Sequence, residues 1–477
     1  MKNALNDKKY YVGLDIGTTK IVAMVGTRNE YGKIQILGYG QSKSDGITKG
    51  VVQNIIKTTQ SILEAIADAK TKTGLEDIQD VMVGIAGQHI LSRSHSDYII
   101  RPDADKLIDI DDLEQLKQQV YRIGLTPGQR IIHVLPQEYR VDDQEPTSDP
   151  IGMIGSRLDA SFHLVIGQVS SSTNIERCVT SSGLNVVDLT LEPLASAEAV
   201  LTEEEKDVGV ALVDIGGGTT DVAIFKDGII RHTAVIPLGG NIITEDIKEG
   251  CAILSRQAEK LKVEFGSAWP GENRDNEIVA ISGIIGREPK EISLKNLSKI
   301  IHARVSEIIG MVYNVIKNYG HEENKKKLIA GIVLTGGGSQ LKHIVQLTEY
   351  ITGMDVRIGY PNQHLTSKPD AKISSPVYAT SIGLVMSAIA HESEKLIMQQ
   401  LEEKKKQEAE EKEREQEALK EQVKQAQLRV ALDSEEVRKE EEAPKEKSGG
   451  FWGRVRNLKD KMDSFFSEDY DDDKDYK

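Results

Sequence analysis

Two stretches of the chain place a compact polar turn between short runs of apolar, often β-branched residues. The first reads YVGLDIGTTKIVA (residues 11–23) and the second reads GVALVDIGGGTTDVAIF (residues 209–225). Each continues through a turn, at residues 29–33 and 226–228, into a third apolar run. Short apolar runs around a glycine cluster predict buried strands joined by a tight hairpin. Two copies of one three-stranded meander in a single chain predict two similar lobes.

The segments between and after the meanders follow strand or helical periodicity. Apolar runs predict buried strands at residues 81–86, 184–191 and 328–334. Apolar positions three and four apart predict helices at residues 47–72, 173–183, 241–251, 255–265, 297–316 and 377–390. Strands that alternate with helices in this way predict an α/β fold, here with a duplicated mixed sheet and helices on both faces.

The sequence pattern of residues 87–167 differs from that of the two meanders and predicts an inserted βαββ subdomain. A strand, a helix capped by Asp111 and Asp112, and two more strands are expected, with the strands at residues 92–100, 130–141 and 158–168. This segment has no glycine loop and no obvious acid–base pair. Its pattern therefore favours a small packing or interaction module.

The C-terminal part of the chain changes character twice. Residues 392–448 are mostly Glu, Lys, Gln and Arg, which predicts a spacer that is either disordered or a solvated single helix. Residues 449–467 then place seven apolar side chains on one helical face: Phe451, Trp452, Val455, Leu458, Met462, Phe465 and Phe466. An isolated amphipathic helix of this kind must bury that face in a membrane interface or a partner groove, and the membrane is the favoured interpretation. Residues 468–477 form an acidic tail that would oppose anionic lipid headgroups.

Composition narrows the class of protein. The chain has 477 residues, enough for more than one domain, and a net charge of −15, which disfavours wholesale nucleic-acid binding. Its two cysteines, Cys178 and Cys251, are expected to be reduced core residues of a cytoplasmic protein, because two are too few for a disulfide framework or a metal cluster. Residues 1–10 lack the apolar core of a signal peptide, and residues 377–390 are too short to span a bilayer.

The two hairpin turns carry the candidate chemistry, because glycine lets backbone N–H groups turn inward around an anion. Phosphate cradles are predicted at Gly17, Thr18 and Thr19 in the first turn and at Gly216, Gly217, Gly218, Thr219 and Thr220 in the second. Asp15 and Asp214 end the strands before these turns, where a carboxylate can hold a hydrated Mg²⁺ against phosphate. Lys20 could reach a β- or γ-phosphate, or it could be an exposed strand lysine.

A glycine-rich hairpin without any ligand is the alternative for each turn, and the internal repeat favours a nucleotide site between the lobes. Both turns lead into strands rather than helices, and the sequence contains no Gly-Lys-Ser/Thr, so Rossmann and P-loop sites are disfavoured.

Two further segments join this candidate site. Glu192 precedes Pro193 at the end of a predicted strand, where it could orient water on a γ-phosphate or simply be an acid favoured by a helix N-terminus. A second glycine cluster is expected to open a helix whose free N–H groups suit a phosphate or adenosine contact. Its residues are Gly336, Gly337, Gly338 and Ser339.

The two Asp-Ile-Gly hairpins and the downstream Thr335-Gly336-Gly337-Gly338-Ser339 segment resemble the loops of the actin, Hsp70 and sugar-kinase superfamily of ATP-binding proteins. Over residues 8–390 the chain is most similar to the FtsA family of bacterial cell-division proteins within it, through its inserted segments and its tail. The resemblance implies an actin-like two-lobed ATPase fold with ATP and Mg²⁺ as cofactors. It assigns lobe 1 to residues 1–86 and 168–202, lobe 2 to 203–244 and 311–391, inserted subdomains to 87–167 and 245–310, a linker to 392–448, a membrane-targeting helix to 449–467 and a tail to 468–477.

The same resemblance implies residue roles. Asp15, Glu192 and Asp214 would act at the phosphates, Glu259 and Lys262 would face the ribose and adenine, and Arg304 and Glu307 would belong to a pocket for the C-terminal tail of the tubulin-like protein FtsZ. From spacing alone, both of the latter pairs could equally be solvated surface residues. The inserted subdomain at 87–167 would take part in filament contacts and in binding other division proteins.

Together these features imply a peripheral protein at the cytoplasmic face of the inner membrane, at the division septum. It would bind ATP with at most weak hydrolysis, polymerise with itself on lipid, and tether FtsZ. Three alternatives stay open. They are an FtsA-like pilus-assembly ATPase, a small-molecule kinase of the same superfamily, for which no catalytic base is evident, and an Hsp70-type chaperone, which would need a β-rich domain after the second lobe.

Overall fold

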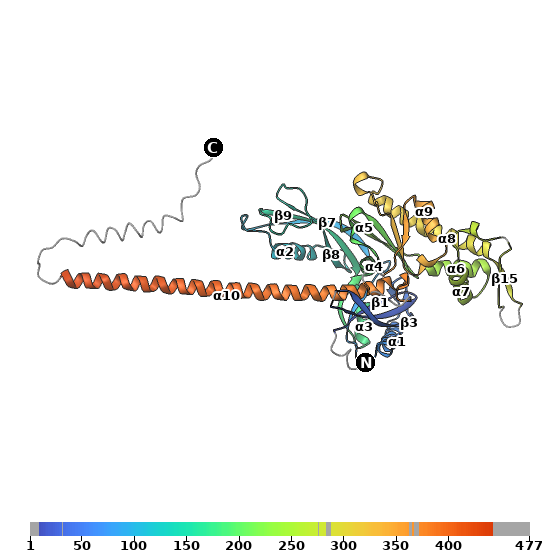
Figure 1. Ribbon diagram of the computed structural model, residues 1–477, viewed down its shortest axis with the longest axis horizontal. Helices are drawn as coiled ribbons and strands as arrows, with labels where there is room; N and C mark the ends of the chain where they lie inside the picture. Colours follow the sequence, from blue (N-terminus) through green and yellow to red (C-terminus); the bar gives the residue numbers. More distant parts are fainter. Residues whose placement is uncertain are drawn as a thin grey trace. The chain divides into compact units, whose positions relative to one another are not determined.

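Two five-stranded sheets with the same strand arrangement form the framework of the protein (Figure 1). The computed structural model describes residues 9–30, 32–274, 276–282, 288–361, 365–366 and 372–441. The chain divides into two units, Met1–Glu394 and Lys395–Lys477, and both sheets belong to the first.

In each sheet an antiparallel meander of three strands is extended by two parallel strands. The first sheet, in the order β10-β6-β1-β2-β3, contains β1 (Tyr11–Ile16), β2 (Lys20–Arg28), β3 (Ile34–Lys43), β6 (Asp80–Ile85) and β10 (Asn185–Leu191). The second, in the order β17-β16-β11-β12-β13, contains β11 (Val210–Ile215), β12 (Thr220–Lys226), β13 (Ile229–Ile236), β16 (Ile332–Thr335) and β17 (Val356–Ile358). The predicted duplication is confirmed, and every strand of one sheet has a counterpart in the other.

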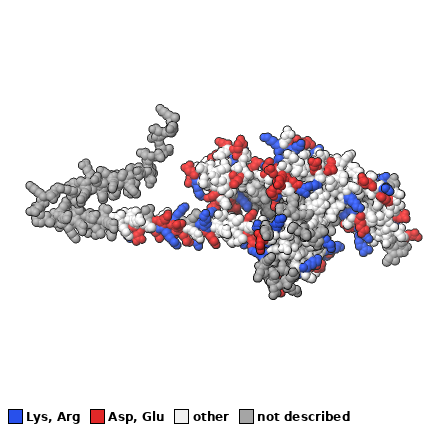
Figure 2. All heavy atoms as spheres, viewed as in Figure 1, with Lys and Arg blue, Asp and Glu red and all other residues white. Residues whose placement is uncertain are grey.

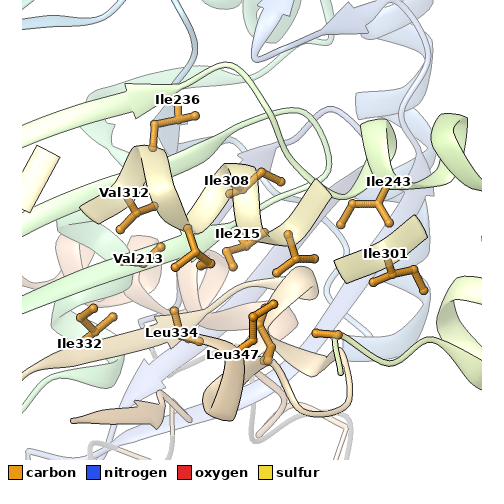
Figure 3. Packing of buried hydrophobic residues seen from close by; sticks show 14 of the residues in the cluster. Val213, Ile215, Ile236, Ile243, Ile301, Ile308, Val312, Ile332, Leu334 and Leu347 are labelled. Atoms are coloured by element: carbon orange, nitrogen blue, oxygen red, sulfur yellow. The ribbon is translucent and has the colours of Figure 1, made fainter. Parts of the chain in front are cut away.

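Groups of buried apolar side chains hold the sheets and helices together. Helices α1 (Ile55–Thr73) and α3 (Val169–Ser181) cover the first sheet. The second sheet packs against α6, α7, α8 and α9, and Figure 3 shows Val213, Ile215 and Leu334 of this sheet beside Ile308 and Val312 of α8. These helices are α6 (Gly240–Cys251), α7 (Ser255–Phe265), α8 (Leu294–Tyr319) and α9 (Ile344–Thr352), and α5 (Glu203–Val208) precedes β11.

Several element boundaries differ from the expected ones for local reasons. The helix expected at residues 47–72 begins only at Ile55, because β4 (Ile47–Thr48) and β5 (Val51–Val52) form a small hairpin first. Asn54 then caps the helix by accepting the Lys57 N–H at 3.0 Å. A second small hairpin, β14 (Ile278–Ile281) with β15 (Lys290–Ser293), precedes α8.

The βαββ subdomain predicted at 87–167 has the expected element order. It contains β7 (Leu91–Ile100), α2 (Ile110–Tyr121), β8 (Gln129–Val141) and β9 (Arg157–Gln168), with sheet order β7-β9-β8 and a core of its own. The helix cap was wrongly placed: Asp109 is the N-cap and accepts the N–H groups of Asp111 at 3.0 Å and Asp112 at 3.3 Å. Asp112 instead serves as the third helical residue of a capping box.

This subdomain contacts the edge strand β13 of the second sheet. The Ser92 hydroxyl donates to the Thr233 carbonyl at 2.6 Å, and the Gln137 amide donates to the Ile230 carbonyl at 2.9 Å. Arg231 of β13 also pairs with Glu138 at 2.6 Å. The subdomain is inserted into the lobe of the first sheet. These bonds to β13 therefore connect the two lobes through side chains.

The second unit begins at Lys395, within helix α10. Helix α10 (Ala379–Glu441) runs past the predicted helix at 377–390, so the described part of the 392–448 linker is helical rather than disordered. Acidic and basic side chains are interspersed along this segment and over the face of the molecule drawn in Figure 2. The predicted helix at 449–467, with Phe451 through Phe466, and the tail at 468–477 lie outside the described residues. Across the described ranges, every helix is too short or too polar to cross a membrane.

Helix α4 (Glu192–Val200) and the first turns of α10 cross between the two sheets, where they share a third apolar core. The crossing is close because Gly383 has no side chain: a Cβ there would overlap the carbonyl oxygen of Ala195. Gly13 of β1 is similarly close, since an added Cβ would lie 2.7 Å from the Leu384 Cβ. The main chains of two helices and a strand therefore pack directly against one another at the centre of the body.

The change Gly383→Ala tests this crossing. Relief of the overlap must separate the two helices, so we expect the free energy of unfolding to fall by about 1–3 kcal/mol. Gly310→Ala in α8 is the matched control, because a Cβ there meets nothing within 4 Å; it should be neutral or stabilise by up to about 1 kcal/mol. Urea unfolding followed by circular dichroism measures both, and equal stabilities would contradict the close crossing.

Candidate functional site

A cleft of about 510 Å³ lies where the two hairpin turns face each other. Its walls include both turns, the acids that precede them and a third glycine segment, Gly336–Gly338. The sequence separated these elements by as much as 320 residues, from Gly17 to Gly337. The fold brings them together because the duplicated sheets place equivalent strand ends at the same cleft.

The two turns nearly touch, and only glycine permits this. An added Cβ at Gly217 would overlap the Thr19 hydroxyl, and one at Gly218 would lie 2.6 Å from the Thr18 hydroxyl. Gly217 also accepts the Asn241 N–H at 2.8 Å, which fixes the second turn to the start of α6. The cleft floor is thus a cradle of backbone and hydroxyl groups that any larger side chain would fill.

Four carboxyl groups line one end of the cleft. Asp15 and Asp214 are the second-to-last residues of β1 and β11, close to the strand ends as predicted, and Glu192 begins α4. Asp221, which the sequence analysis missed, lies opposite Asp214 in the β11–β12 register. Burial raises the pKa of Asp15 and of Asp214. Burial, followed by the charges of Asp15, Asp221 and Asp214, raises the pKa of Glu192 well above its usual range.

Asp221 is the most confined of these acids. It is 4% exposed, and its Oδ1 has no hydrogen-bond partner among the described residues, whereas Oδ2 accepts the Thr219 hydroxyl at 3.0 Å. Burial, with a contribution from the charge of Asp214, raises its pKa to about 7. An aspartate directly before the buried apolar run Val222–Phe225 was the signal available in the sequence.

Lys20 faces the carboxyl groups from the first turn, so it is not an exposed strand lysine. Its Nζ donates to the Val377 carbonyl at 3.0 Å and lies 4.1 Å from the centre of the Tyr378 ring. Burial lowers its pKa to about 8, although Asp15 and Asp214 oppose that shift. Four carboxyl groups and one ammonium group therefore meet at this end of the cleft, and this excess of acidic groups suits a ligand that binds together with a cation.

The opposite end of the cleft is formed by α6 and α7. Glu259 and Lys262 pair at 2.7 Å, and the Lys262 Nζ also donates to the Gly240 carbonyl and the Thr244 hydroxyl, each at 2.8 Å. Both residues line the cleft, so this pair is not an ordinary surface pair. Val263 beside them is 72% exposed and offers an apolar wall that the sequence analysis did not single out.

The structure places some predicted site residues in the framework of the cleft. The Thr220 hydroxyl donates to the Leu238 carbonyl and the Ser339 hydroxyl to the Gly336 carbonyl, both at 2.8 Å. Both side chains lie behind the cleft wall. The third glycine segment leads into a short 3₁₀ turn, Gly337–Gln340, and the expected α-helix starts only at Ile344. That part of the prediction was wrong, because successive glycines disfavour an α-helical first turn.

Arg304 and Glu307 lie on α8, outside the residues that line the cleft. Arg304 makes two bonds to Asp246 of α6, at 2.6 and 3.0 Å, and pairs with Glu307 one turn along its own helix. The guanidinium is therefore held in a fixed orientation at the surface by two carboxylates.

Comparison with known proteins identifies families, curated proteins and solved structures that are similar to this chain. A family described as "Cell division protein FtsA" matches residues 211–383, and one described as "SHS2 domain inserted in FTSA" matches residues 87–166. The Cell division protein FtsA of Pseudomonas aeruginosa is 41% identical over 391 residues, which cover 82% of this chain and 92% of that protein. Its Bacillus subtilis counterpart is 31% identical over 384 residues, covering 80% and 84%. Among solved structures, the PilM-PilN type IV pilus biogenesis complex is similar in fold, with a TM-score of 0.60 at 15% identity over 80% of this chain and 98% of that one.

The pKa of Asp221 gives a test that needs no ligand. A carboxyl group whose pKa is raised on folding binds its proton more tightly in the folded state, so its stabilising effect is lost as the pH rises from about 4 to about 7. We expect Asp221→Asn to raise the melting temperature at pH 8 by about 3 °C or more and to change it little near pH 4.5. Thermal unfolding between pH 4.5 and 8 checks this, with Asp207→Asn as a control on an aspartate outside the cleft. An unchanged melting temperature at pH 8 would contradict the buried charge.

Proposed function

The chain belongs to the FtsA family of cell-division proteins, and on that basis we propose that it is an actin-like, ATP-binding protein that polymerises on the cytoplasmic membrane at the septum and anchors the FtsZ ring there. The observation that carries the proposal is the cleft in which twin glycine turns and paired carboxylates face each other. Family membership at 41% identity removes the basis for the pilus-assembly, kinase and chaperone alternatives.

The residues of the cleft fit a magnesium nucleotide. The cradle that a Cβ at Gly217 or Gly218 would fill matches a phosphate chain, and the unpartnered oxygen of Asp221 shows a local excess of acceptors that a cation would satisfy. Asp15 and Asp214 would hold Mg²⁺ through water, and the ion would neutralise phosphate charge. Among the described residues there is no group of three His, Cys, Asp or Glu side chains arranged around a metal.

The other cleft residues have separate tasks in this proposal. Lys20 donates one hydrogen bond to the Val377 carbonyl in the structure, and its ammonium group has further protons to donate to a phosphate oxygen. The glycine segment Gly336–Ser339 and the Glu259–Lys262 pair would bind the adenosine side. Glu192 would orient the attacking water on the γ-phosphate. Its pKa is raised by burial and by the neighbouring charges of Asp15, Asp221 and Asp214.

Partner and membrane binding would use surfaces outside the cleft. Arg304 and Glu307 on α8 would meet the C-terminal tail of FtsZ, and the subdomain at 87–167 would contact other division proteins and neighbouring copies. Residues 449–467 would enter the lipid interface with their seven apolar side chains. A single helix of this kind anchors only reversibly, so polymerisation would strengthen attachment through avidity.

Nucleotide binding is tested by Gly217→Val. The added side chain would collide with Thr19, so we expect the affinity for ATP with magnesium to fall about 100-fold or more, as measured by isothermal titration calorimetry. Gly124→Val is the matched control, because an added Cβ there meets nothing within 4 Å. Equal ATP affinities of both variants would refute the placement of the phosphates.

Membrane and FtsZ binding are tested together by co-sedimentation with vesicles of phosphatidylethanolamine and phosphatidylglycerol, with ATP and magnesium. The full chain should pellet and carry FtsZ with it, whereas a chain ending at Ser448 should leave both in the supernatant. Arg304→Glu should keep the chain in the pellet and lose FtsZ, and Lys299→Glu on the same helix is its charge-matched control. A truncated chain that still pellets, or FtsZ that follows the Arg304→Glu chain, would refute the corresponding part.

A further inference from the structure

Two buried serines make the same contact in the two lobes. The Ser381 hydroxyl, in the first turn of α10, donates to Oδ2 of Asp15 at 2.9 Å. The Ser196 hydroxyl, in α4, donates to Oδ2 of Asp214 at 2.7 Å. Both serines are fully buried. Each lies four residues after a residue that lines the cleft, Glu192 before Ser196 and Val377 before Ser381.

The contacts are reciprocal between the lobes. Asp15 lies near the end of β1 of the first sheet, whereas α10 follows the last strand of the second sheet. Asp214 lies near the end of β11 of the second sheet, whereas α4 follows β10 of the first sheet. Each carboxylate is therefore held by a helix from the opposite lobe, at the point where α4 and α10 cross without intervening side chains.

The serines also decide which carboxylate oxygen remains for the cleft. In both acids Oδ2 accepts the hydrogen bond from the serine hydroxyl. The other oxygen of Asp214 lies against Gly336, where an added Cβ would overlap it, and that of Asp15 would lie 3.6 Å from a Cβ at Gly17. Both free oxygens thus lie beside the glycine segments that form the predicted phosphate cradle.

The carboxylate of Asp214 accepts a hydrogen bond from a second hydroxyl, so its orientation is more firmly fixed than that of the Asp15 carboxylate. The Thr380 hydroxyl lies 3.2 Å from the same Oδ2 and 2.9 Å from the Ser196 hydroxyl. Ser196, Thr380 and Asp214 therefore form a closed triangle with members from both lobes.

From this geometry we infer that Ser196 and Ser381 are positioning residues, which orient the two acids for a hydrated magnesium ion only when the lobes are closed as they are here. Residues that hold a metal-facing group from behind typically change metal affinity by about 10–100-fold when they are removed. If the lobes separate, both serines leave their carboxylates, so the acids lose their fixed direction at the same moment. The inference rests on the proposed binding of nucleotide and magnesium, and it adds a reason why that binding and lobe closure are coupled.

The experiment compares Ser196→Ala and Ser381→Ala with the parent chain, by titration of ATP in magnesium and in EDTA. Removal of the donors should weaken ATP binding about tenfold or more in magnesium and less than about threefold in EDTA. Ser172→Ala is the matched control: Ser172 is as buried, but its hydroxyl donates to Gln168 and Val169 in its own helix turn. Equal losses with and without magnesium would overturn the positioning role, because a general loss of structure would act in both.

A second measurement uses the protein without nucleotide. Hydrogen exchange in α4 and the first turns of α10 should be faster in both serine variants than in Ser172→Ala, since each variant releases one inter-lobe contact. Unchanged exchange would overturn the coupling to closure. Should an alanine variant fail to fold, Ser196→Cys or Ser381→Cys keeps the side-chain volume with a much weaker donor, and the same comparison applies.

A parent chain that binds no ATP in either buffer would refute the proposed nucleotide function and the magnesium role of the serines with it. A parent chain that binds ATP only with magnesium, beside variants identical to it, would leave the proposed function standing and refute the serine role alone.

Discussion

The centre of this protein depends on keeping two carboxylates, Asp15 and Asp214, buried and close to each other. Burial of an ionised carboxyl group is costly unless donors or cations compensate. Here serine hydroxyls from opposite lobes supply part of that compensation, but burial still raises the pKa of both carboxyl groups. The duplicated sheets, the glycine turns and the crossing helices are all arranged so that these two groups can face one cleft.

This arrangement places the destabilising charges where a ligand can offset them. Asp221 and Glu192 add two more carboxyl groups to the end of the cleft that contains Asp15 and Asp214. Lys20 faces these acids, and the Glu259–Lys262 pair lies at the opposite end of the cleft. The proposed magnesium nucleotide would be the compensating partner, so the folded body and its ligand would be stabilised by the same interactions.

The sequence was sufficient to find the parts of the site that are repeated or local. The two Asp-Ile-Gly turns were recognisable because the same pattern occurs twice. The spacing of Glu259 and Lys262 predicted only that the two side chains pair on one helix face, and the family resemblance was needed to assign them to the site. Ser196 and Ser381 could not be found in this way. Ser381 lies 366 residues from its partner Asp15, and nothing in the local pattern of either helix records that distant contact. The 3₁₀ turn after Gly336 was missed for a different reason, since a glycine run permits several backbone paths and tertiary contacts select one.

The subdomain at 87–167 has a consequence for how copies of the chain can associate. Strand β13 is the outermost strand of its sheet, and exposed edges of this kind offer carbonyl groups on which a strand from another molecule can pair. Ser92 and Gln137 occupy the carbonyls of Thr233 and Ile230 there. The inserted subdomain thus closes the open border of the second sheet, and a neighbouring chain has to be recognised by its side chains rather than by continuing the sheet at β13.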